Sequence, residues 1–190
     1  MPAGQVLKIP AGLDAAGAAS LPEVFANAYL NLYMEAGLST GERVLVLCPL
    51  SIMKSAWQQD LFKFAMHRSC SVAHGAAKQR EKIINAGSDF VIINFDGVAV
   101  VKDAIAKGGF DLIVIDEANA YKNPMTNRWK ILDRIVRETN PRMWMLTGTP
   151  AAQSPVDAYG LAKLVNPDGC PKYFGQFRDS VLYKVTQFKW

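Results

Sequence analysis

Four short apolar runs, separated by stretches with helical periodicity, limit what this chain can fold into more than any other feature. The runs are Val44–Cys48, Phe90–Phe95, Asp111–Ile115 and Met143–Leu146. None of them alternates apolar with polar residues, which is typical of strands covered on both faces, so a parallel sheet is favoured over a half-exposed antiparallel one. Two weaker strand candidates are Gln5–Ile9 and Ser71–Ala73.

The segments between the runs show the 3.6-residue period of amphipathic helices. The clearest apolar stripe extends from Leu21 to Ala36, and Gly37 follows it as a stop. Further helices are expected within residues 53–64, 131–136 and 156–165. Three tryptophans fall within the expected elements and are predicted to lie in the core: Trp57, Trp129 and Trp144. Alternating strands and helices are typical of βαβ units, so the sequence predicts an α/β domain with helices covering the sheet.

Length and composition exclude several classes of protein. The chain has 190 residues, 50% of them apolar and 20% charged, which fits one folded domain and excludes intrinsic disorder. No apolar stretch approaches the roughly 18–20 residues that cross a bilayer, and the N-terminus lacks the basic and apolar segments of a secretory signal. The three cysteines are widely spaced without a C-x-x-C motif, so neither a disulfide framework nor a zinc site is indicated. We expect a cytoplasmic protein that does not enter a membrane.

Charge is unevenly distributed along the chain. The net charge is +4, but the first 42 residues hold one lysine and four acidic residues, so residues 43–190 carry +7. A moderately basic body allows a polyanionic partner without establishing one, because excess lysine is often only a solvated face.

The sharpest chemical motif is the pair Asp116 and Glu117, which directly follows the apolar residues Leu112–Ile115. In an open parallel sheet, the carboxyl ends of the strands line the ligand crevice. Two adjacent carboxylates there suit nucleotide hydrolysis, because the first can hold Mg²⁺, usually through water, and the second can orient the attacking water. The alternative is a strand that simply ends in two solvated acids.

Two other strand ends carry polar residues. Thr147–Thr149 could contact phosphate or carboxylate through two hydroxyls, although the same residues before Pro150 also make an ordinary turn. After another run, Pro49 ends the strand and Ser51 is placed to cap the helix that carries Trp57. A helix N-terminus there could alternatively hold a backbone phosphate of nucleic acid.

Five motifs occur in an ordered series along the chain. They are P-L-S at 49–51, I-N-F-D-G at 93–97, D-E-A-N at 116–119, K-N-P at 122–124 and T-G-T-P at 147–150. This series resembles the first RecA-like lobe of superfamily 2 helicases, and most of all the Swi/Snf-type helicase-like ATPases, particularly their compact phage and bacterial members. The resemblance covers residues 43 to about 167. It implies a three-layer RecA-like α/β domain of the P-loop NTPase type, with a mostly parallel sheet.

The resemblance also implies roles for individual residues. It makes Asp116 and Glu117 the catalytic Walker B pair, with Asp116 as the metal ligand. It implies nucleic-acid contacts, or coupling of nucleotide state to them, for Pro49, Leu50, Ser51, Asn94, Thr147, Gly148 and Thr149. Asn119 replaces the histidine that is usual in DEAH-type members, so the link between hydrolysis and Thr147–Thr149 is open at this point.

The Walker A loop of this family, G-x-x-x-x-G-K-[ST], is altered in this chain. Upstream of Pro49, the glycine frame is met by Gly12 and Gly17, but Ala18 and Ala19 stand where lysine and a hydroxyl residue belong. Neither alanine supplies a charge or a metal ligand. The following Ser-Leu-Pro-Glu predicts a capping box that starts the helix near residue 21, so the loop is either remodelled or keeps its shape with a vacant phosphate cradle.

These observations predict three segments: a divergent N-terminal part at 1–42, the RecA-like lobe at 43–167, and an extension at 168–190 that begins a linker. The resemblance implies a DNA-dependent ATPase that uses ATP and Mg²⁺ and acts on double-stranded DNA between two lobes. We expect the second lobe to be absent from 190 residues, so that the isolated chain cannot hydrolyse ATP. The alternative is a non-catalytic nucleic-acid- or protein-binding module that kept the lobe and lost the loop.

Overall fold

The computed structural model describes residues 37–151 and 153–182. The chain divides at Ser39, and the unit that begins at Thr40 is described by itself. Several predictions therefore lie outside the described residues: the strand at Gln5–Ile9, the helix from Leu21 to Ala36, and the glycine frame Gly12–Ala19. Within the described ranges, no helix is long and apolar enough to cross a membrane.

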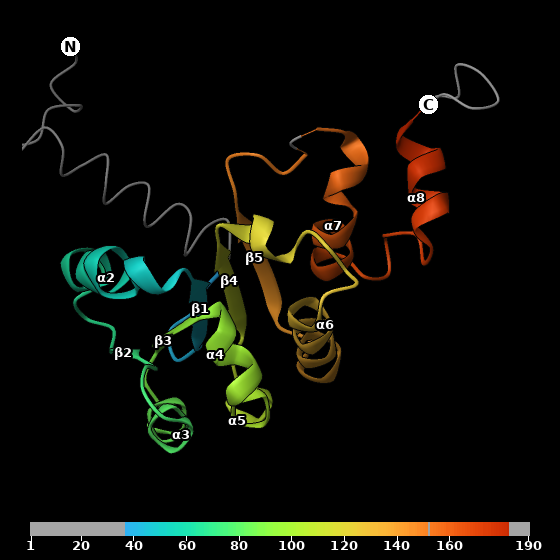
Figure 1. The fold of residues 1–190 in the computed structure, drawn as a ribbon. Coiled ribbons are helices and arrows are strands. Elements are labelled where there is room, and N and C mark those ends of the chain that lie inside the picture. Colours follow the sequence, from blue (N-terminus) through green and yellow to red (C-terminus); the bar gives the residue numbers. More distant parts are fainter. Residues whose placement is uncertain (1–36, 152, 183–190) are drawn as a thin grey trace, which may run out of the picture. The chain divides into compact units, whose positions relative to one another are not determined.

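A parallel sheet forms the centre of the unit (Figure 1). Its strands within the described residues are β1 (Val44–Cys48), β2 (Cys70–Val72), β3 (Phe90–Asn94), β4 (Leu112–Asp116) and β5 (Arg142–Leu146). They are ordered β2-β3-β1-β4-β5, and each neighbouring pair is parallel. The structure confirms the predicted parallel sheet and each predicted run in this range. The bounds differ by one residue in places, since Ala73, Phe95 and Asp111 lie just outside the strands and Phe95 begins a helix instead of ending β3.

Helices and short helical turns connect the strands, and three more follow the last strand. In chain order they are the 3₁₀ helix η3 (Leu50–Ile52), the π-helix η4 (Met53–Gln58), α2 (Gln59–Phe64), α3 (Ala77–Asn85), α4 (Phe95–Val100), α5 (Lys102–Lys107), η5 (Ala118–Tyr121), α6 (Asn127–Thr139), η6 (Pro155–Ala158), α7 (Tyr159–Val165) and α8 (Phe174–Val181). The last helix lies within residues 168–190, which the sequence predicted only as an extension.

The strand order places helices on both faces of the sheet. The chain moves from β1 to β2 in one direction and from β2 onward to β5 in the other. Because such crossovers are right-handed, η4 and α2 cover one face and α3 to α6 cover the other, and Figure 1 shows β2 and β3 between α2 and α3. The result is the α/β fold with three layers that the sequence predicted.

The core is made of the strand residues and the apolar stripes of the helices. Leu45, Val91 and Ile113 point to the face where Ile84 of α3 and Leu132 of α6 also lie, and all five side chains are almost completely buried. The strand residues of opposite parity are buried as well, which explains why the runs do not alternate.

The three tryptophans have different surroundings. Trp129 of α6 is buried as predicted, and its indole N–H donates to the backbone oxygen of Gly160 over 2.9 Å. Trp57 and Trp144 are only partly buried, so the prediction that they are core residues is wrong for these two. An indole carries a polar N–H that needs a partner, and this requirement places Trp57 at the edge of the core.

Arg43 joins the elements at the amino ends of the strands. Its guanidinium donates to the backbone oxygens of Ser88 over 3.0 Å, of Ile84 over 2.9 Å, and of Gly108. The same group lies 4.7 Å from the centre of the Phe110 ring. One side chain therefore satisfies carbonyl groups at the ends of α3 and α5 and in the loop before β3.

Tyr121 carries a buried hydroxyl without a hydrogen-bond partner among the described residues. The ring itself is well placed, because it meets Phe95 edge to face at 5.6 Å. We therefore expect Tyr121→Phe to raise the free energy of unfolding by about 1 kcal/mol, since it removes an unsatisfied polar group and keeps the ring. Chemical denaturation followed by circular dichroism measures this change.

Tyr159→Phe is the matched control for that substitution. The Tyr159 hydroxyl donates to the backbone oxygen of Lys172 over 2.8 Å and accepts from Lys163 over 3.1 Å. Removing it should lower the free energy of unfolding by about 1 kcal/mol. Equal effects of the two substitutions would contradict the difference between a satisfied and an unsatisfied hydroxyl.

Candidate nucleotide and nucleic-acid site

The carboxyl ends of β1 and β4 form a switch point of the sheet. These strands are neighbours, yet the chain leaves β1 toward β2 and leaves β4 toward β5 on the opposite side. Loops that part in this way open the crevice in which α/β proteins bind ligands. The register places four residues in one row at this edge: Asn94, Cys48, Asp116 and Leu146.

Asp116 ends β4 with both carboxylate oxygens in hydrogen bonds. The indole Nε1 of Trp57 donates to Oδ2 over 2.9 Å, and the backbone N–H of Glu117 donates to Oδ1 over 2.9 Å. These two donors fix the orientation of the half-buried carboxylate, and each oxygen keeps a lone pair for a cation or its bound water. The site is thus set up to present an oriented negative charge at the sheet edge.

Trp57 is a site residue that the sequence analysis missed. It lies in the π-helix η4, a rare form of helix that is frequent at functional sites. The apolar spacing of residues 53–64 correctly predicted a helical segment, but only the demand of the indole N–H for a partner could have signalled its position. Through Trp57, the segment after β1 contacts the metal-ligand candidate at the end of β4.

Glu117 has a left-handed backbone conformation with φ 53° and ψ 52°. A residue other than glycine pays about 1–2 kcal/mol for this conformation, and such strain is concentrated at functional sites. The turn separates the exposed Glu117 from the half-buried Asp116 beside it. The two adjacent carboxylates therefore have different surroundings, as two different chemical roles require.

Asn119 connects the acidic motif to the end of β5. Its side-chain amide donates to the hydroxyl of Thr149 over 2.9 Å, and the backbone N–H of Thr149 donates to the hydroxyl of Thr147 over 3.3 Å. This hydrogen bond joins the acidic motif to the Thr147–Thr149 turn, and a role of Asn119 in linking hydrolysis to that turn stays a prediction. Gly148 lies between the two threonines and is exposed.

The turn after β1 differs from its prediction in one respect. Pro49, not Ser51, takes the capping position, because the 3₁₀ helix already begins at Leu50. Ser51 makes no side-chain capping bond, and its backbone oxygen instead accepts the hydroxyl of Ser55 over 3.1 Å. Leu50 and Ser51 are both exposed at the sheet edge, so the turn is accessible to a partner.

Asn94 at the end of β3 is held by Arg80. The guanidinium donates to the Asn94 amide oxygen over 2.9 Å and to the backbone oxygens of Ala73 and Gly75. A side chain at Gly97 would collide with this guanidinium, so the glycine of the I-N-F-D-G motif leaves room for it. With its oxygen engaged, Asn94 keeps an amide N–H₂ group, a donor that suits a phosphate oxygen.

The structure thus gathers the sequence-predicted site residues from Pro49 onward at one edge of the sheet, while the Gly12–Ala19 frame lies outside the described residues. Asp116, Glu117, Asn119 and Thr149 form a connected group, and the turn at Pro49 and Asn94 follow on the neighbouring strands. In the part of the chain that the structure describes, neither carboxylate takes part in an ion pair, and no cluster of three or more His, Cys, Asp or Glu side chains could hold a metal. A metal bound by so few protein ligands relies on water and phosphate oxygens, which is typical of Mg²⁺.

Cys48 lies in the same row as Asp116 and has an unreactive thiol. Burial, and after it the charge of Asp116, raises the pKa of Cys48 to about 12. We expect iodoacetamide at pH 8 to label Cys48 about a thousandfold more slowly in the folded chain than in urea, because thiols have a pKa near 8.5 when unfolded. Peptide mapping by mass spectrometry measures the two rates.

The raised pKa of Cys48 also affects the pH dependence of stability. The folded state favours the neutral thiol. The thiol therefore contributes fully to the free energy of unfolding below about pH 8.5, and this contribution falls as the pH rises toward the pKa of the folded state. Cys48→Ser should therefore flatten the alkaline loss of unfolding free energy. Equal labelling rates in folded and unfolded chains would contradict the burial of this thiol.

Comparisons with known proteins identify the family. A sequence model of the SNF2-related domain matches residues 24–187. This chain belongs to the SNF2-related domain family. The match begins after the Gly12–Ala19 frame and includes α8.

Two relatives show how widely the domain is used. The mouse Chromodomain-helicase-DNA-binding protein 1-like is 29% identical over 145 residues, which are 73% of this chain and 16% of that protein. Putative protein p41 of Acyrthosiphon pisum secondary endosymbiont phage 1 is 28% identical over 144 residues, which are 72% of this chain and 31% of that protein. The chain therefore spans less than a third of the length of these relatives.

A solved structure has the same fold. It is described as the Sulfolobus solfataricus SWI2/SNF2 ATPase core in complex with dsDNA, and it is 25% identical with a TM-score of 0.61. The match covers 92% of this chain and 40% of that one. The chain is thus an SNF2-type, RecA-like lobe, as its motif series predicted.

Proposed function

We propose that this lobe works in a DNA-dependent ATPase of the Swi/Snf type, with ATP and Mg²⁺ at the end of β4 and double-stranded DNA along the ends of β1 and β3. The observation that carries the proposal is the connected group at the sheet edge. Trp57 ties the segment after β1 to Asp116, and Asn119 ties the acidic motif to Thr149.

The carboxylate pair fits a magnesium ion with a nucleotide. Asp116 presents two oriented oxygens, each with a lone pair to spare, and would hold the ion through water or directly. Glu117 is exposed one residue away and would orient the attacking water. When bound, Mg²⁺ would neutralise charge on the phosphate oxygens.

The phosphate-binding part of the proposed site has less support than the metal-binding part. Gly12, Gly17, Ala18 and Ala19 occupy the Walker A frame in the sequence, where the two alanines offer neither a cation nor a hydroxyl. A second lobe would supply the arginines that stabilise the transferring phosphoryl group. We therefore propose that the isolated chain does not turn over ATP, and DNA-stimulated steady-state turnover by the purified 190-residue chain would contradict this.

Double-stranded DNA is the proposed partner for two reasons. The related archaeal core was solved with dsDNA. The exposed turn at Leu50 and Ser51 and the amide of Asn94 lie at one edge, within residues 43–190 that carry a net charge of +7. Phosphate contacts of this kind position a protein on a duplex without reading its sequence. A cytoplasmic location is part of the same proposal.

Manganese tests the metal site, because bound Mn²⁺ broadens the NMR signals of nearby nuclei. We expect broadening of the ¹⁵N-labelled chain to centre on Asp116 and Glu117. Asp116→Asn should abolish it, whereas Asp103→Asn, which removes an exposed carboxylate of α5, should leave it intact. Broadening centred elsewhere, or unchanged by Asp116→Asn, would contradict the assignment.

The two alanines favour a second candidate, a nucleic-acid- or protein-binding module without catalysis. A thermal melt with Mg·ATP separates the candidates, since a ligand at 100 times its dissociation constant stabilises by about 2.7 kcal/mol. A shift that grows in the Ala18→Lys/Ala19→Thr variant supports the ATPase lobe and the Walker A alignment. No shift in either protein supports the module.

A further inference from the structure

A hollow of about 660 Å³ lies away from the sheet edge, between the K-N-P loop and the last two helices. Its lining comes from the loop at 122–125, Trp129 of α6, the η6–α7 segment and residues 172–174. We call it the lysine-rimmed hollow. None of the residues assigned to nucleotide or DNA lines it, so it does not belong to the site described above.

The floor of the hollow is apolar and partly open to solvent. Trp129 and Tyr159 are buried beneath it, while Met125, Tyr173 and Phe174 are 75%, 61% and 48% exposed. Apolar side chains this exposed are ordinary when they are scattered, but three that converge on one concavity mark an interaction site.

The rim carries an excess of positive charge. Lys122, Lys163 and Lys172 line the hollow, and none of them forms an ion pair with a carboxylate in the described part of the chain. Asp157 is the single acidic residue of the lining, and its carboxylate is engaged by the backbone N–H groups of Gln153 and Ser154. The lining therefore attracts negative charge.

Lys163 is held at the rim in a fixed position. Its ammonium group donates to the Tyr159 hydroxyl over 3.1 Å and to the backbone oxygen of Lys172 over 2.9 Å. An ammonium group has three donors, so one remains for a ligand. A carboxylate at the rim would complete its hydrogen bonds.

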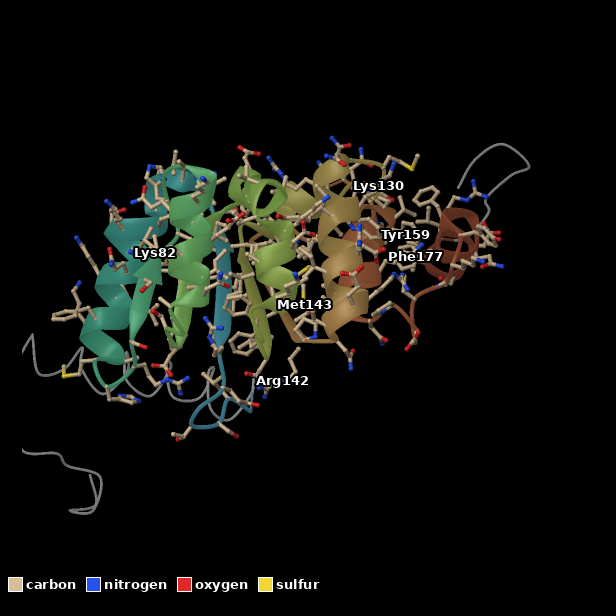
Figure 2. All side chains as sticks on the ribbon, turned by 90° about the horizontal axis from the view of Figure 1, so that it is seen from below. Lys82, Lys130, Arg142, Met143, Tyr159 and Phe177 are labelled. Carbon is tan, nitrogen blue, oxygen red and sulfur yellow. The ribbon has the colours of Figure 1, made fainter. Side chains whose placement is uncertain are left out.

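The aromatic rings are arranged for side-chain burial and not for base stacking. Tyr159 meets Phe174 at 5.5 Å and Phe177 at 5.2 Å, and Figure 2 shows Tyr159 and Phe177 side by side where α7 faces α8. The ammonium groups of Lys163 and Lys172 lie over the Tyr159 and Tyr173 rings. Stacking platforms for single-stranded nucleic acid need open ring faces, whereas Tyr159 is buried and Lys172 covers one face of Tyr173.

We propose that the lysine-rimmed hollow binds an acidic peptide segment that inserts one large apolar side chain between the exposed Met125, Tyr173 and Phe174. The basic rim and apolar floor together match this chemistry. The chain's own residues 183–190 match it poorly, because they contain two lysines and no acidic residue. The inference concerns a partner protein and does not depend on nucleotide or DNA binding.

A heptapeptide with a central phenylalanine between two runs of three glutamates tests the proposal. Titrated to millimolar concentration into the ¹⁵N-labelled full chain, it should shift the NMR signals of residues 122–125 and 172–174. Replacing its phenylalanine by alanine, or its glutamates by lysines, should weaken binding by at least about tenfold. Absence of shifts at these residues, or equal binding of the lysine peptide, would overturn the proposal.

Charge reversal on the protein completes the test. The double variant Lys122→Glu/Lys172→Glu should bind the glutamate peptide at least about tenfold more weakly. The control Lys102→Glu/Lys107→Glu on α5 should bind it with unchanged affinity. Denaturation midpoints establish that both double variants fold. Equal losses in the two variants would show nonspecific attraction and overturn the proposal. So would a DNA strand, or a peptide of residues 183–190, that displaces the glutamate peptide from the hollow.

Discussion

Replacing Arg43 by methionine should lower the free energy of unfolding by about 4 kcal/mol. The substitution keeps an apolar stem of similar volume but removes the guanidinium and its hydrogen bonds to the carbonyl groups of Ile84, Ser88 and Gly108. Each carbonyl that loses a charged donor in a partly buried place costs about 1–3 kcal/mol, and the contact with the Phe110 ring is lost as well. Urea denaturation of both proteins measures the difference.

Arg134→Met is the matched control for this prediction. Arg134 is exposed on α6, and among the described residues it forms an ion pair only with Glu138, four residues along the helix, at 2.6 Å. Such a solvent-exposed pair contributes little to stability, so this substitution should leave the free energy of unfolding nearly unchanged. If both substitutions cost the same, Arg43 does not join the ends of α3 and α5 in the way described.

Gly160→Ala has the next largest expected effect, a loss of about 3 kcal/mol of unfolding free energy. Gly160 is buried in the first turn of α7, and a side chain there would collide with the backbone oxygen and carbon of Lys122. Backbone atoms cannot rotate away as a flexible side chain can. Either α7 or the K-N-P loop must move, which also strains the Trp129 hydrogen bond to Gly160.

Gly175→Ala provides the comparison, because Gly175 occupies the same second position in α8 and has open space around it. There the added methyl group should be neutral or stabilise by up to about 1 kcal/mol, since alanine is the better helix former. Denaturation midpoints of the two variants, measured under the same conditions, compare their effects on stability. A Gly160→Ala protein as stable as the Gly175→Ala protein would show that the loop does not pack closely on α7.

The fold could be predicted largely from local sequence, because burial on both faces leaves a visible pattern. The run from Leu112 to Ile115 predicted a strand, and its position before Asp116 predicted which edge of the sheet is functional. The helix at residues 174–181 was missed, because it is short and its apolar residues pack on Tyr159 from a distant segment. Short helices depend on such tertiary contacts more than on their own propensity.

The contacts within the site could not be predicted in the same way. Trp57 and Asp116 are separated by 59 residues, and Asn119 and Thr149 by 30. Both hydrogen bonds depend on strand order, which places β4 between β1 and β5. Hydrophobic periodicity specifies which face of an element is buried, but it carries no information about which side chains meet at the ends of neighbouring strands.

The hydrogen bond between Trp57 and Asp116 connects the proposed DNA contact after β1 to the proposed metal site. Leu50 and Ser51, which are proposed to meet DNA, are joined by only a few residues to Trp57, which holds the carboxylate of Asp116. A displacement of this segment would therefore change the orientation of Asp116, the proposed metal ligand. Trp57→Phe should keep the fold and lose this hydrogen bond, so that DNA and metal binding become independent of one another.

DNA binding at the carboxyl edge of the sheet, as proposed above, can be tested by titrating the ¹⁵N-labelled chain with a DNA duplex and following its NMR spectrum. With a short DNA duplex at low salt, we expect the NMR signals of Leu50, Ser51 and Asn94 and of the indole N–H of Trp57 to shift. Signals at Ser88 and Gly108, at the opposite edge, should not move. Signals that shift mainly at the opposite edge, or no change at the Trp57 indole and the turn after β1, would show that DNA does not bind at the carboxyl edge.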